Sequence, residues 1–333
     1  MKSVPVHRIS IVRSFTQFLA EVGTPIEHEF KRVNLPYYAL ENVNNYIPSH
    51  KFWLFLVNTS HNEGINDLGF RVGQQFGSNS LDPKFERLIK QSPSLYQGIL
   101  ESSAVSNRTV TNCHIGIYHR PNHSYYYHKP SCAANNPAVE HIGWFGLMTM
   151  LSLVRAYTGT HWQPSEIGVM TDNRPDPYIR EMFPDSVIKP SQKFSYITLE
   201  NKLLSLPPLN IDKELQTSQS EYYLPFHDNF SGLLEQLLLS YIQENKLDIN
   251  FLAELCNMSK RTLQRNLNKE GSSFSKILAH ARYKSAKEML LNTNLTICKI
   301  GNTLGFKDSS NFARAFHQYS GVSPNLYRKL HVK

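Results

Sequence analysis

The feature that most restricts the fold of this chain is a short apolar pattern near its carboxyl end, closed by a glycine. Thr296 has the side chain of a helix N-cap. Apolar residues then recur at helical spacing, at Ile297, Ile300 and Leu304. The pattern stops at Gly305. The sequence therefore predicts a short helix over residues 297–304 that ends in a tight turn.

A second helix is predicted after this turn, from about Ser309 to Tyr319, with Asp308 as its N-cap. Its aromatic residues fall at i, i+4 and i+7, so Phe312, Phe316 and Tyr319 are expected to face inward. Two short helices joined by a tight turn, the second apolar on one side and polar on the other, form a helix-turn-helix, which lays its second helix in the major groove of DNA. The polar face carries Ser310, Asn311, Arg314 and Gln318.

The same pattern occurs once more upstream. Asn250 is expected to cap a helix over residues 251–255, and Ser259 to cap a second helix that runs to about Glu270. Residues 274–291 form one long predicted helix without Gly or Pro, stiff enough to fix the separation of the two units. In the upstream unit, Leu263 and Leu267 are expected to face inward, and the opposite face carries Arg261, Gln264, Arg265 and Asn268.

Residues 230–330 resemble the DNA-binding domain of the AraC/XylS family of bacterial transcription regulators, in which one long helix joins two such units. MSKRTLQRNLNKEGSSF is similar to the family's first recognition segment. LGFKDSSNFARAFHQYSGVSPNLYR follows its second signature, including GF, F-x-R-x-F, G-x-x-P and the closing YR. Gly301 departs from the family, whose members usually carry Ala there, and this costs about 1 kcal/mol of helix propensity.

The resemblance also implies which residues contact DNA. Arg can form paired hydrogen bonds with guanine, and Gln or Asn with adenine. Lysines on phosphates position the protein without reading sequence. For Arg265 and Arg314, an ion pair within the domain remains the alternative. Base contacts are implied for Arg261, Gln264, Arg265, Ser309, Ser310, Asn311 and Arg314, and phosphate contacts for Lys260, Lys269 and Lys307.

Charge is distributed unevenly along the chain. The net charge of +8 lies entirely after residue 230, where there are 15 Lys and Arg and 7 Asp and Glu. The first 230 residues carry 20 charges of each sign. A basic excess on one part of a protein suits the neutralisation of phosphates, and it predicts DNA binding that weakens with salt. An ordinary solvated surface is the alternative, which the tandem motif beside the charge disfavours.

The first part of the chain, over residues 8–76, is predicted to be mostly helical. The apolar segment HKFWLFLVNTSH is consistent with either a buried helix or a buried strand. Three glycines follow, at Gly69, Gly73 and Gly77, with a spacing that matches neither common phosphate-binding loop, so we expect close helix packing instead. Another helix is expected over residues 81–103, interrupted near Pro93.

Residues 109–128 indicate a β-hairpin that turns at residues 120–122. Histidines five residues apart lie on opposite faces of a regular strand, so we expect polar strand positions and not a metal site. Residues 140–157 form the strongest predicted helix of this half, and its methionines either belong to the core or line a ligand cavity. The four histidines of the hairpin are His114, His119, His123 and His128.

This half is similar to the amino-terminal region of the AraC-type branch that includes fatty-acid- and amino-acid-responsive activators, an arabinose-binding-domain-like region of the ornithine-regulator type. The motifs that carry the resemblance are FWLFL, DLGFRVGQQFG, WFGLMTMLSLVRAYTGTHWQP and FSYITLENKLLSLPPL. The family commonly has a Gly-rich step where this chain has SNSLDPKFER. The resemblance implies an α+β effector-binding or dimerisation domain that is not an enzyme.

The predicted architecture is an α+β regulatory domain over residues 1–205, a linker over residues 206–229, and an all-α DNA-binding domain over residues 230–333 with two tandem helix-turn-helix units. The linker is indicated by its prolines and its polar QTSQS tract. The four cysteines have no paired spacing, and no apolar run has the length of a signal peptide or a membrane span. We therefore expect a cytoplasmic protein with no catalytic residues, no metal and no cofactor.

The leading hypothesis is a sequence-specific transcription activator whose amino-terminal domain binds a small effector, such as a fatty acid, an amino acid or an aromatic compound. Expected partners are double-stranded DNA, RNA polymerase and a second copy of the chain, and no membrane. The alternative is an effector-independent regulator whose amino-terminal domain only dimerises. An enzyme of the DNA-repair methyl-acceptor kind would need clustered cysteines, which this chain lacks.

Overall fold

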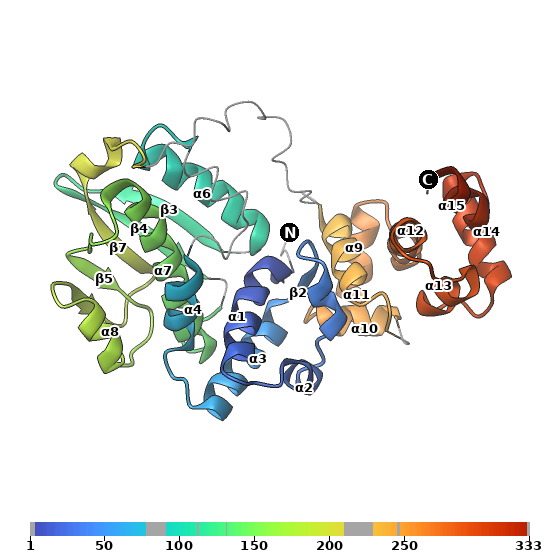
Figure 1. Cartoon of the computed structure of the whole chain (residues 1–333), viewed down its shortest axis with the longest axis horizontal. Coiled ribbons are helices and arrows are strands. Elements are labelled where there is room, and N and C mark those ends of the chain that lie inside the picture. Colours follow the sequence, from blue (N-terminus) through green and yellow to red (C-terminus); the bar gives the residue numbers. More distant parts are fainter. Residues whose placement is uncertain are drawn as a thin grey trace. The chain divides into compact units, whose positions relative to one another are not determined.

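The computed structural model describes residues 4–77, 91–111, 113–130, 132–209, 229–244 and 247–331. The described residues form two compact units (Figure 1). One contains the stretches 5–44 and 49–225, and the other contains Val4, Asn45–Pro48 and the residues from 226 onward, as far as each is described. Most of the predicted linker, and residues 81–90 of a predicted helix, lie outside the described residues. Among the described helices, none combines the length and the apolar character that crossing a bilayer requires.

The amino-terminal unit begins with helices, as the apolar spacing of its sequence predicts. The segment HKFWLFLVNTSH is helical, which decides between the two structures that its pattern allowed. One face of this helix is buried, where Phe52, Phe55 and Leu56 are at most 1% exposed. The elements of this part are β1 (Val6–Arg8), α1 (Ile9–Glu21), α2 (Ile26–Arg32), η1 (Tyr37–Glu41), α3 (Ser49–Glu63) and α4 (Leu68–Phe76).

Glycines let helix α4 pack directly on helix α7 (Ala138–Thr158). A Cβ atom at Gly69 would lie 1.9 Å from the carbonyl oxygen of His141. A Cβ atom at Gly73 would lie 2.6 Å from the Cβ of Met148. These distances are too short for any side chain, so the structure confirms close helix packing as the reason for the glycines.

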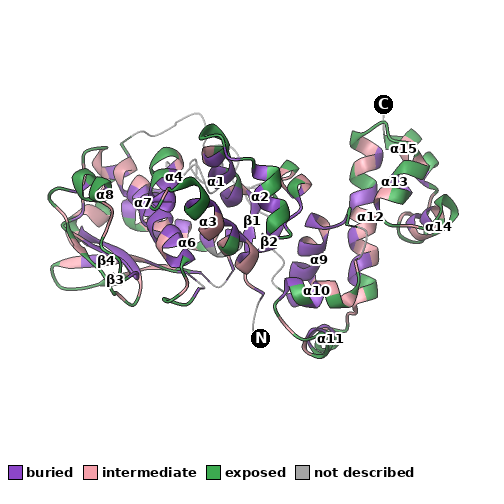
Figure 2. Cartoon of the chain, turned by 90° about the horizontal axis from the view of Figure 1, so that it is seen from below, coloured by how far each residue is buried: buried purple, intermediate pink, exposed green. Residues whose placement is uncertain are grey.

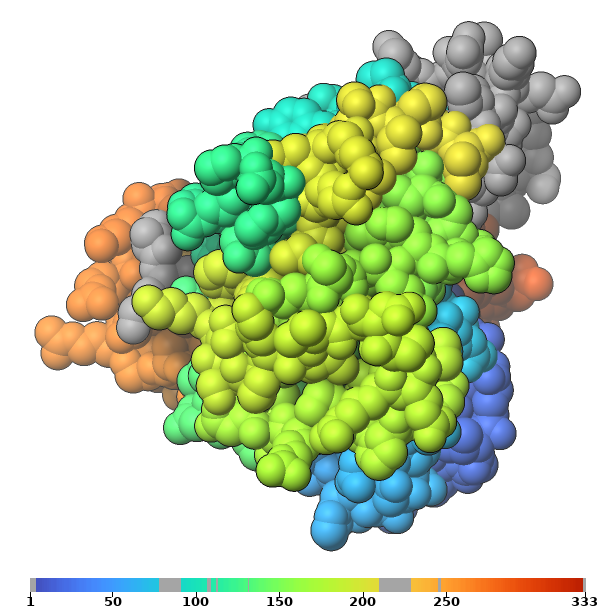
Figure 3. Space-filling model, turned by 90° about the vertical axis from the view of Figure 1, so that its left-hand side faces the viewer, coloured from blue at the N-terminus to red at the C-terminus, as the bar shows by residue number. Residues whose placement is uncertain are grey.

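A five-stranded sheet completes this unit, with strand order β3-β4-β7-β5-β6. The β3–β4, β4–β7 and β7–β5 pairs are antiparallel, and the β5–β6 pair is parallel. Helices α6 and α7 pack against the sheet. Figure 3 looks onto the side built by the segments after α7, in lime to yellow, beside the green hairpin. The bounds are α6 (Leu95–Thr109), β3 (His114–His119), β4 (His123–Lys129), β5 (Glu166–Gly168), α8 (Pro177–Met182), β6 (Val187–Lys189), β7 (Ser195–Glu200) and η3 (Asn201–Ser205).

The predicted hairpin is confirmed as β3 and β4, with His114 opposite Lys129 and His119 opposite Ser124. Its histidines lie on opposite faces, as their spacing predicts. His128 is only 6% exposed and belongs to the core. His123, five residues earlier, is half-buried and its ring contacts Tyr125.

The carboxyl-terminal unit is all-helical apart from the short strand β2 (Tyr46–Pro48), which packs on helix α9. Its centre is α12, whose 19 residues make a rod about 28 Å long. Helices α9, α10 and α11 lie toward one end of α12, and α13, α14 and α15 toward the other (Figure 2). The predicted fold class is therefore confirmed. The helices are α9 (Phe230–Ser240), α10 (Ile249–Leu255), α11 (Lys260–Lys269), α12 (Phe274–Asn292), α13 (Ile297–Thr303), α14 (Ser309–Ser320) and α15 (Pro324–His331).

Helix caps fix the start of each helix in this unit. Ser259, Thr296 and Asp308 cap α11, α13 and α14 through their side-chain oxygens, as predicted. The cap predicted for α10 is wrong. Asp248, not Asn250, accepts the first backbone N–H groups, from Asn250 and Phe251, both at 2.8 Å. The helix begins at Ile249, and a carboxylate suits the positive end of a helix better than an amide does.

Candidate nucleic-acid interface

Helix α11 is apolar on one side and polar on the other. Leu263 and Leu267 are at most 1% exposed, so this side is part of the core, as predicted. The side chains of the opposite side are exposed. In the described part of the chain, none of them is engaged in a hydrogen bond or an ion pair, so Arg265 does not form the internal ion pair that was its alternative. The exposed residues are Lys260, Arg261, Gln264, Arg265 and Lys269.

Glu270, directly after α11, holds this helix against α9. Its carboxylate accepts the backbone N–H groups of Phe230 at 2.9 Å and Ser231 at 2.8 Å, which are the first of α9. Asn229 accepts the next one, from Gly232, at 2.8 Å. Partial burial raises the pKa of Glu270, but these donors lower it more, and the net shift is downward. The exposed polar side of α11 is thus held in place from the carboxyl-terminal end of the helix.

Helix α14, like α11, has one buried apolar side and one polar side. Phe312 and Phe316 are at most 2% exposed, as the stripe predicted. Tyr319 is 42% exposed, so its predicted inward position is wrong. At the end of α14 the neighbour is the surface of α12, and Tyr319 stacks there on Tyr283 with ring centroids 5.2 Å apart.

A chain of hydrogen bonds orders the polar side of α14. Asp308 accepts the backbone N–H of Asn311 at 2.7 Å and its side-chain amide at 2.6 Å. Asn311 in turn accepts a hydrogen bond from Nη2 of Arg314 at 2.6 Å. Arg314 is therefore held by a neutral amide and not by the ion pair that was its alternative. Lys307, Ser309 and Ser310 are exposed beside this network.

The turn between α13 and α14 depends on Gly301 and Gly305. A Cβ atom at Gly301 would lie 3.1 Å from the Cβ of Phe312, so the two helices cross closely, as predicted. Gly305 has a φ of 74°, a left-handed conformation that suits glycine. The guanidinium of Arg282 lies over the ring of Phe306, 5.1 Å from its centroid, and burial lowers the pKa of Arg282.

Two further charged residues, Glu235 and Arg328, connect helices α9 and α15 to α12. Sequence analysis did not predict these roles. Glu235 of α9 binds Nδ1 of His280 at 2.6 Å and Nζ of Lys284 at 2.5 Å. Burial raises the pKa of Glu235, but the hydrogen bonds from Lys284 and His280 lower it more. A carboxylate inside the apolar segment LLEQLLL was the available signal.

Arg328 fastens the other end of α12. Its Nε donates to the carbonyl of Leu290 at 3.2 Å, and its Nη2 donates to that of Leu295 at 2.7 Å. Carbonyl groups at the end of a helix lack partners within it, and a cation there is favourable. The closing YR of the signature is thus structural, since Tyr327 also packs edge-on against Phe316.

The ten residues with predicted DNA contacts therefore fall into two groups, one on α11 and one on and before α14. All are exposed except the half-buried Asn311. The two groups lie toward opposite ends of α12 (Figure 2). This arrangement provides two separate polar faces. Their side chains can donate hydrogen bonds to the edges of bases and to phosphate oxygens.

Comparison with known proteins agrees with this geometry. Residues 252–330 match the family described as "Helix-turn-helix domain". The chain is 31% identical over 100 residues to the transcriptional activator NphR of a Rhodococcus species, covering 30% of each protein. It is 37% identical over 97 residues to the raffinose operon transcriptional regulatory protein RafR of Pediococcus pentosaceus, covering 28% of this chain and 35% of RafR. It is 37% identical over 82 residues to the ornithine utilization regulator of Pseudomonas aeruginosa, covering 25% of this chain and 24% of that regulator.

The matched segments span about a third or less of the length of these three relatives. Among solved structures, the transcriptional regulator CdpR of Pseudomonas aeruginosa aligns over 95% of this chain and 97% of its own, with 15% identity and a TM-score of 0.43. Residues 252–330 of this chain thus form an AraC-type helix-turn-helix domain of the kind that AraC/XylS-type transcriptional regulators carry, and DNA is the partner of such a domain.

Proposed function

We propose that the chain is a sequence-specific activator of transcription that reads two successive major grooves with α11 and α14. The observation that supports this proposal is the placement of two exposed polar helix faces toward opposite ends of one unbroken helix. Successive major grooves on one side of DNA are about 34 Å apart, and α12 is a rod of about 28 Å before the recognition helices add their own width.

In this proposal, bases are read by residues from both helices. Arg261, Gln264 and Arg265 contact bases from α11. Ser309, Ser310, Asn311 and Arg314 do so from α14, where the hydrogen bond from Arg314 to Asn311 holds both side chains ready. Lys260, Lys269 and Lys307 contact phosphates.

The base contacts are tested by mapping the DNA bound by the full chain and then comparing variants on one mapped site. Arg265→Ala and Arg314→Ala should each lower the affinity for that site by about 1–3 kcal/mol and relax the preference at the contacted position. Arg13→Ala, which removes an exposed charge on α1, is the matched control and should bind as wild type. If both test variants give the same footprint as wild type, the base contacts assigned to Arg265 and Arg314 are wrong.

We also propose that the amino-terminal unit responds to a small effector. Support comes from the names of two relatives, an activator and an ornithine utilization regulator, and from a largely apolar cavity within this unit. Transcription in vitro from a mapped promoter, with purified full chain and RNA polymerase, would show a higher yield of transcript if the protein activates. A chain whose output responds to no compound would favour the alternative, in which this unit only dimerises.

A further inference from the structure

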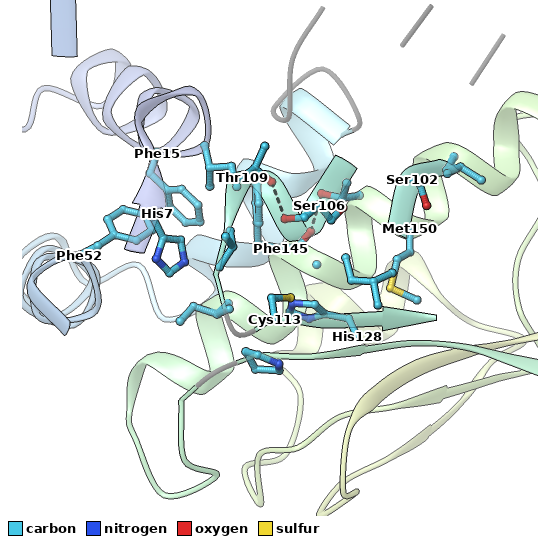
Figure 4. A pocket seen from close by; sticks show the side chains of 18 of the residues that line it. His7, Phe15, Phe52, Ser102, Ser106, Thr109, Cys113, His128, Phe145 and Met150 are labelled. Carbon is cyan, nitrogen blue, oxygen red and sulfur yellow. Dashed lines mark hydrogen bonds between the residues drawn. The ribbon is translucent and has the colours of Figure 1, made fainter. Parts of the chain in front are cut away.

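The amino-terminal unit contains a cavity of about 60 Å³ between its helices and its sheet (Figure 4). An aromatic cluster forms one wall, in which Phe15 lies 4.9 Å from Phe145 and 5.4 Å from Phe52, measured between ring centroids. Helix α7 contributes Met150 to the opposite side. Strands β1, β3 and β4 and helices α1, α3, α6 and α7 all reach the cavity, so no single motif of the sequence marks it.

Among the residues whose side chains the structure describes, no Lys, Arg, Asp or Glu lines this cavity. Most of its polar groups are bonded to each other. The hydroxyl of Tyr126 and that of Ser102 are 2.9 Å apart, and Nδ1 of His7 lies 2.8 Å from Oγ of Ser49. Thr149 donates to the carbonyl of Phe145 at 2.9 Å. The walls therefore offer apolar contact and few open hydrogen-bonding positions.

Trp53 and His128 are exceptions, because Nε1 of Trp53 and Nδ1 of His128 are buried without a hydrogen-bond partner among the described residues. His128 is the more deeply buried of the two, at 6% exposed. The imidazole fits at this place on the wall because residue 146 is glycine, where a Cβ would lie 2.5 Å from Nδ1. Burial lowers the pKa of His128 to about 4, and burial together with His128 lowers that of His7 to about 3, so both rings are neutral at neutral pH.

We infer that this cavity is the effector site and that its ligand is a small uncharged molecule, mainly apolar, with one polar group that hydrogen-bonds to His128. This inference rests on the proposed effector control. A carboxylate would lose its hydration in the cavity and would meet no cation among the described lining residues, which costs several kcal/mol in general. An uncharged aromatic compound fits this environment, whereas a fatty acid or an amino acid does not.

The ligand-free cavity must expand to hold such a molecule. A cavity of about 150 Å³ binds benzene, and the volume present here is about 60 Å³. Met150 lies on the wall, and methionine adapts easily because its side chain is unbranched and has three rotatable bonds. Binding therefore moves side chains of α7, the central helix of this unit.

A second hollow in the same unit offers the opposite chemistry. It has a volume of about 560 Å³ and is lined by Arg155, whose Nε donates to the carbonyl of Trp162 at 3.0 Å. An anionic ligand would choose this hollow. The charge of the ligand therefore decides between the two sites.

The test adds matched neutral and anionic compounds to the full chain and measures the midpoint temperature of thermal unfolding, Tm. Any ligand that binds only the folded state raises the Tm. The pairs are para-ethylphenol with para-ethylbenzoate, hexanol with hexanoate, and indole with indole carboxylate. At least one neutral compound should raise the Tm saturably, and its anionic counterpart should bind about a hundredfold more weakly or worse.

Two variants locate the binding. Ser106→Phe fills the cavity and should abolish the shift, whereas Ser103→Phe, one turn away on α6 and outside the cavity, should keep it. His128→Phe should bind ethylbenzene as well as wild type does and should lose the preference for para-ethylphenol over ethylbenzene. This second comparison remains informative if Ser106→Phe does not fold.

Three results would overturn the inference: anions that bind as tightly as their neutral partners, a neutral shift that survives Ser106→Phe, or no shift with any neutral compound. An anionic shift lost in Arg155→Gln would place the effector in the second hollow. If the chain binds a specific DNA sequence but no neutral compound raises its Tm, this inference is wrong and the proposed function stands. If a neutral compound raises the Tm but the chain prefers no DNA sequence over random DNA, the proposed function is wrong instead.

Discussion

At the scale of single residues, the amino-terminal unit depends on Gly69, where backbone and not a side chain blocks any larger residue. The blocking atom is the carbonyl oxygen of His141, 1.9 Å from the position of a Cβ. Gly69→Ala should therefore lower the free energy of unfolding by about 3 kcal/mol, because α4 and α7 must move apart. Urea unfolding followed by tryptophan fluorescence measures this, since Trp53, Trp144 and Trp162 are the only tryptophans and all lie in this unit.

Gly98→Ala is the matched control. Its Cβ would lie 2.6 Å from the hydroxyl of Tyr157, which is the end of a side chain and not backbone. Alanine also gains about 1 kcal/mol of helix propensity in α6, so this variant should stay within about 1 kcal/mol of wild type. Equal losses in the two variants would show that the contact at residue 141 is not the cause.

Three buried histidines predict that this unit is sensitive to acid. Burial lowers the pKa of His7 to about 3, of His128 to about 4 and of His141 to about 4, against about 6.5 in an unfolded chain. The unfolded state therefore takes up protons first as the pH falls. The contribution of these histidines to the free energy of unfolding should be constant above pH about 6.5. Below that pH the free energy of unfolding should fall toward pH about 4, by up to about 1.4 kcal/mol per pH unit for each histidine.

Urea unfolding between pH 7 and pH 4, followed by tryptophan fluorescence, checks this slope. His128→Phe should flatten it by the share of one histidine, because phenylalanine takes up no proton in either state. His61→Gln, at an exposed position of α3, should leave it unchanged. A slope equal in wild type and His128→Phe would contradict the prediction.

At the scale of elements, the sequence predicted what local chemistry decides. The caps Ser259, Thr296 and Asp308 were predictable because a cap bonds to a backbone only two or three residues away. Tyr319 was not, since its exposure depends on how it lies against Tyr283 of α12, a contact between residues far apart in the sequence. The cavity was least predictable of all, because it joins side chains from elements that are more than 100 residues apart, such as His7 and Phe145.

Helix α12 makes a prediction of its own, because a rigid rod permits one spacing of the two DNA half-sites. Inserting about five base pairs between them turns the second half-site to the opposite face of the DNA, and inserting about ten restores the face but moves it one turn, about 34 Å, farther away. A 19-residue helix cannot extend that far. Both insertions should therefore lower the affinity to that of a single half-site, by about a hundredfold or more.

Fluorescence anisotropy with the three DNA duplexes measures this loss. Arg314→Ala offers a control, since a chain weakened at α14 should discriminate less among the duplexes. Recovery of full affinity with ten inserted base pairs would mean that the two recognition helices are joined flexibly, or that they belong to different copies of the chain.

At the scale of the whole molecule, the separation of charge assigns phosphate binding to one unit. The net charge of +8 lies after residue 230, and the preceding residues are neutral in sum. Replacing Lys260, Lys269 and Lys307 together by alanine should reduce the slope of log affinity against log salt by about one for each lysine. The loss should be nearly equal on the specific site and on random DNA, because phosphates carry no sequence information.

A triple replacement in the neutral part of the chain is the matched control, with Arg13, Lys31 and Lys193 changed to alanine at exposed positions. It changes the total charge by the same amount but should leave the salt slope unchanged, because close phosphate contacts and not total charge release the counterions. Binding titrations at four salt concentrations between 50 and 200 mM separate the two cases. Equal changes in slope for both triple variants would mean that the net charge of the molecule, and not the placement of lysines around α11 and α14, governs its attraction to DNA.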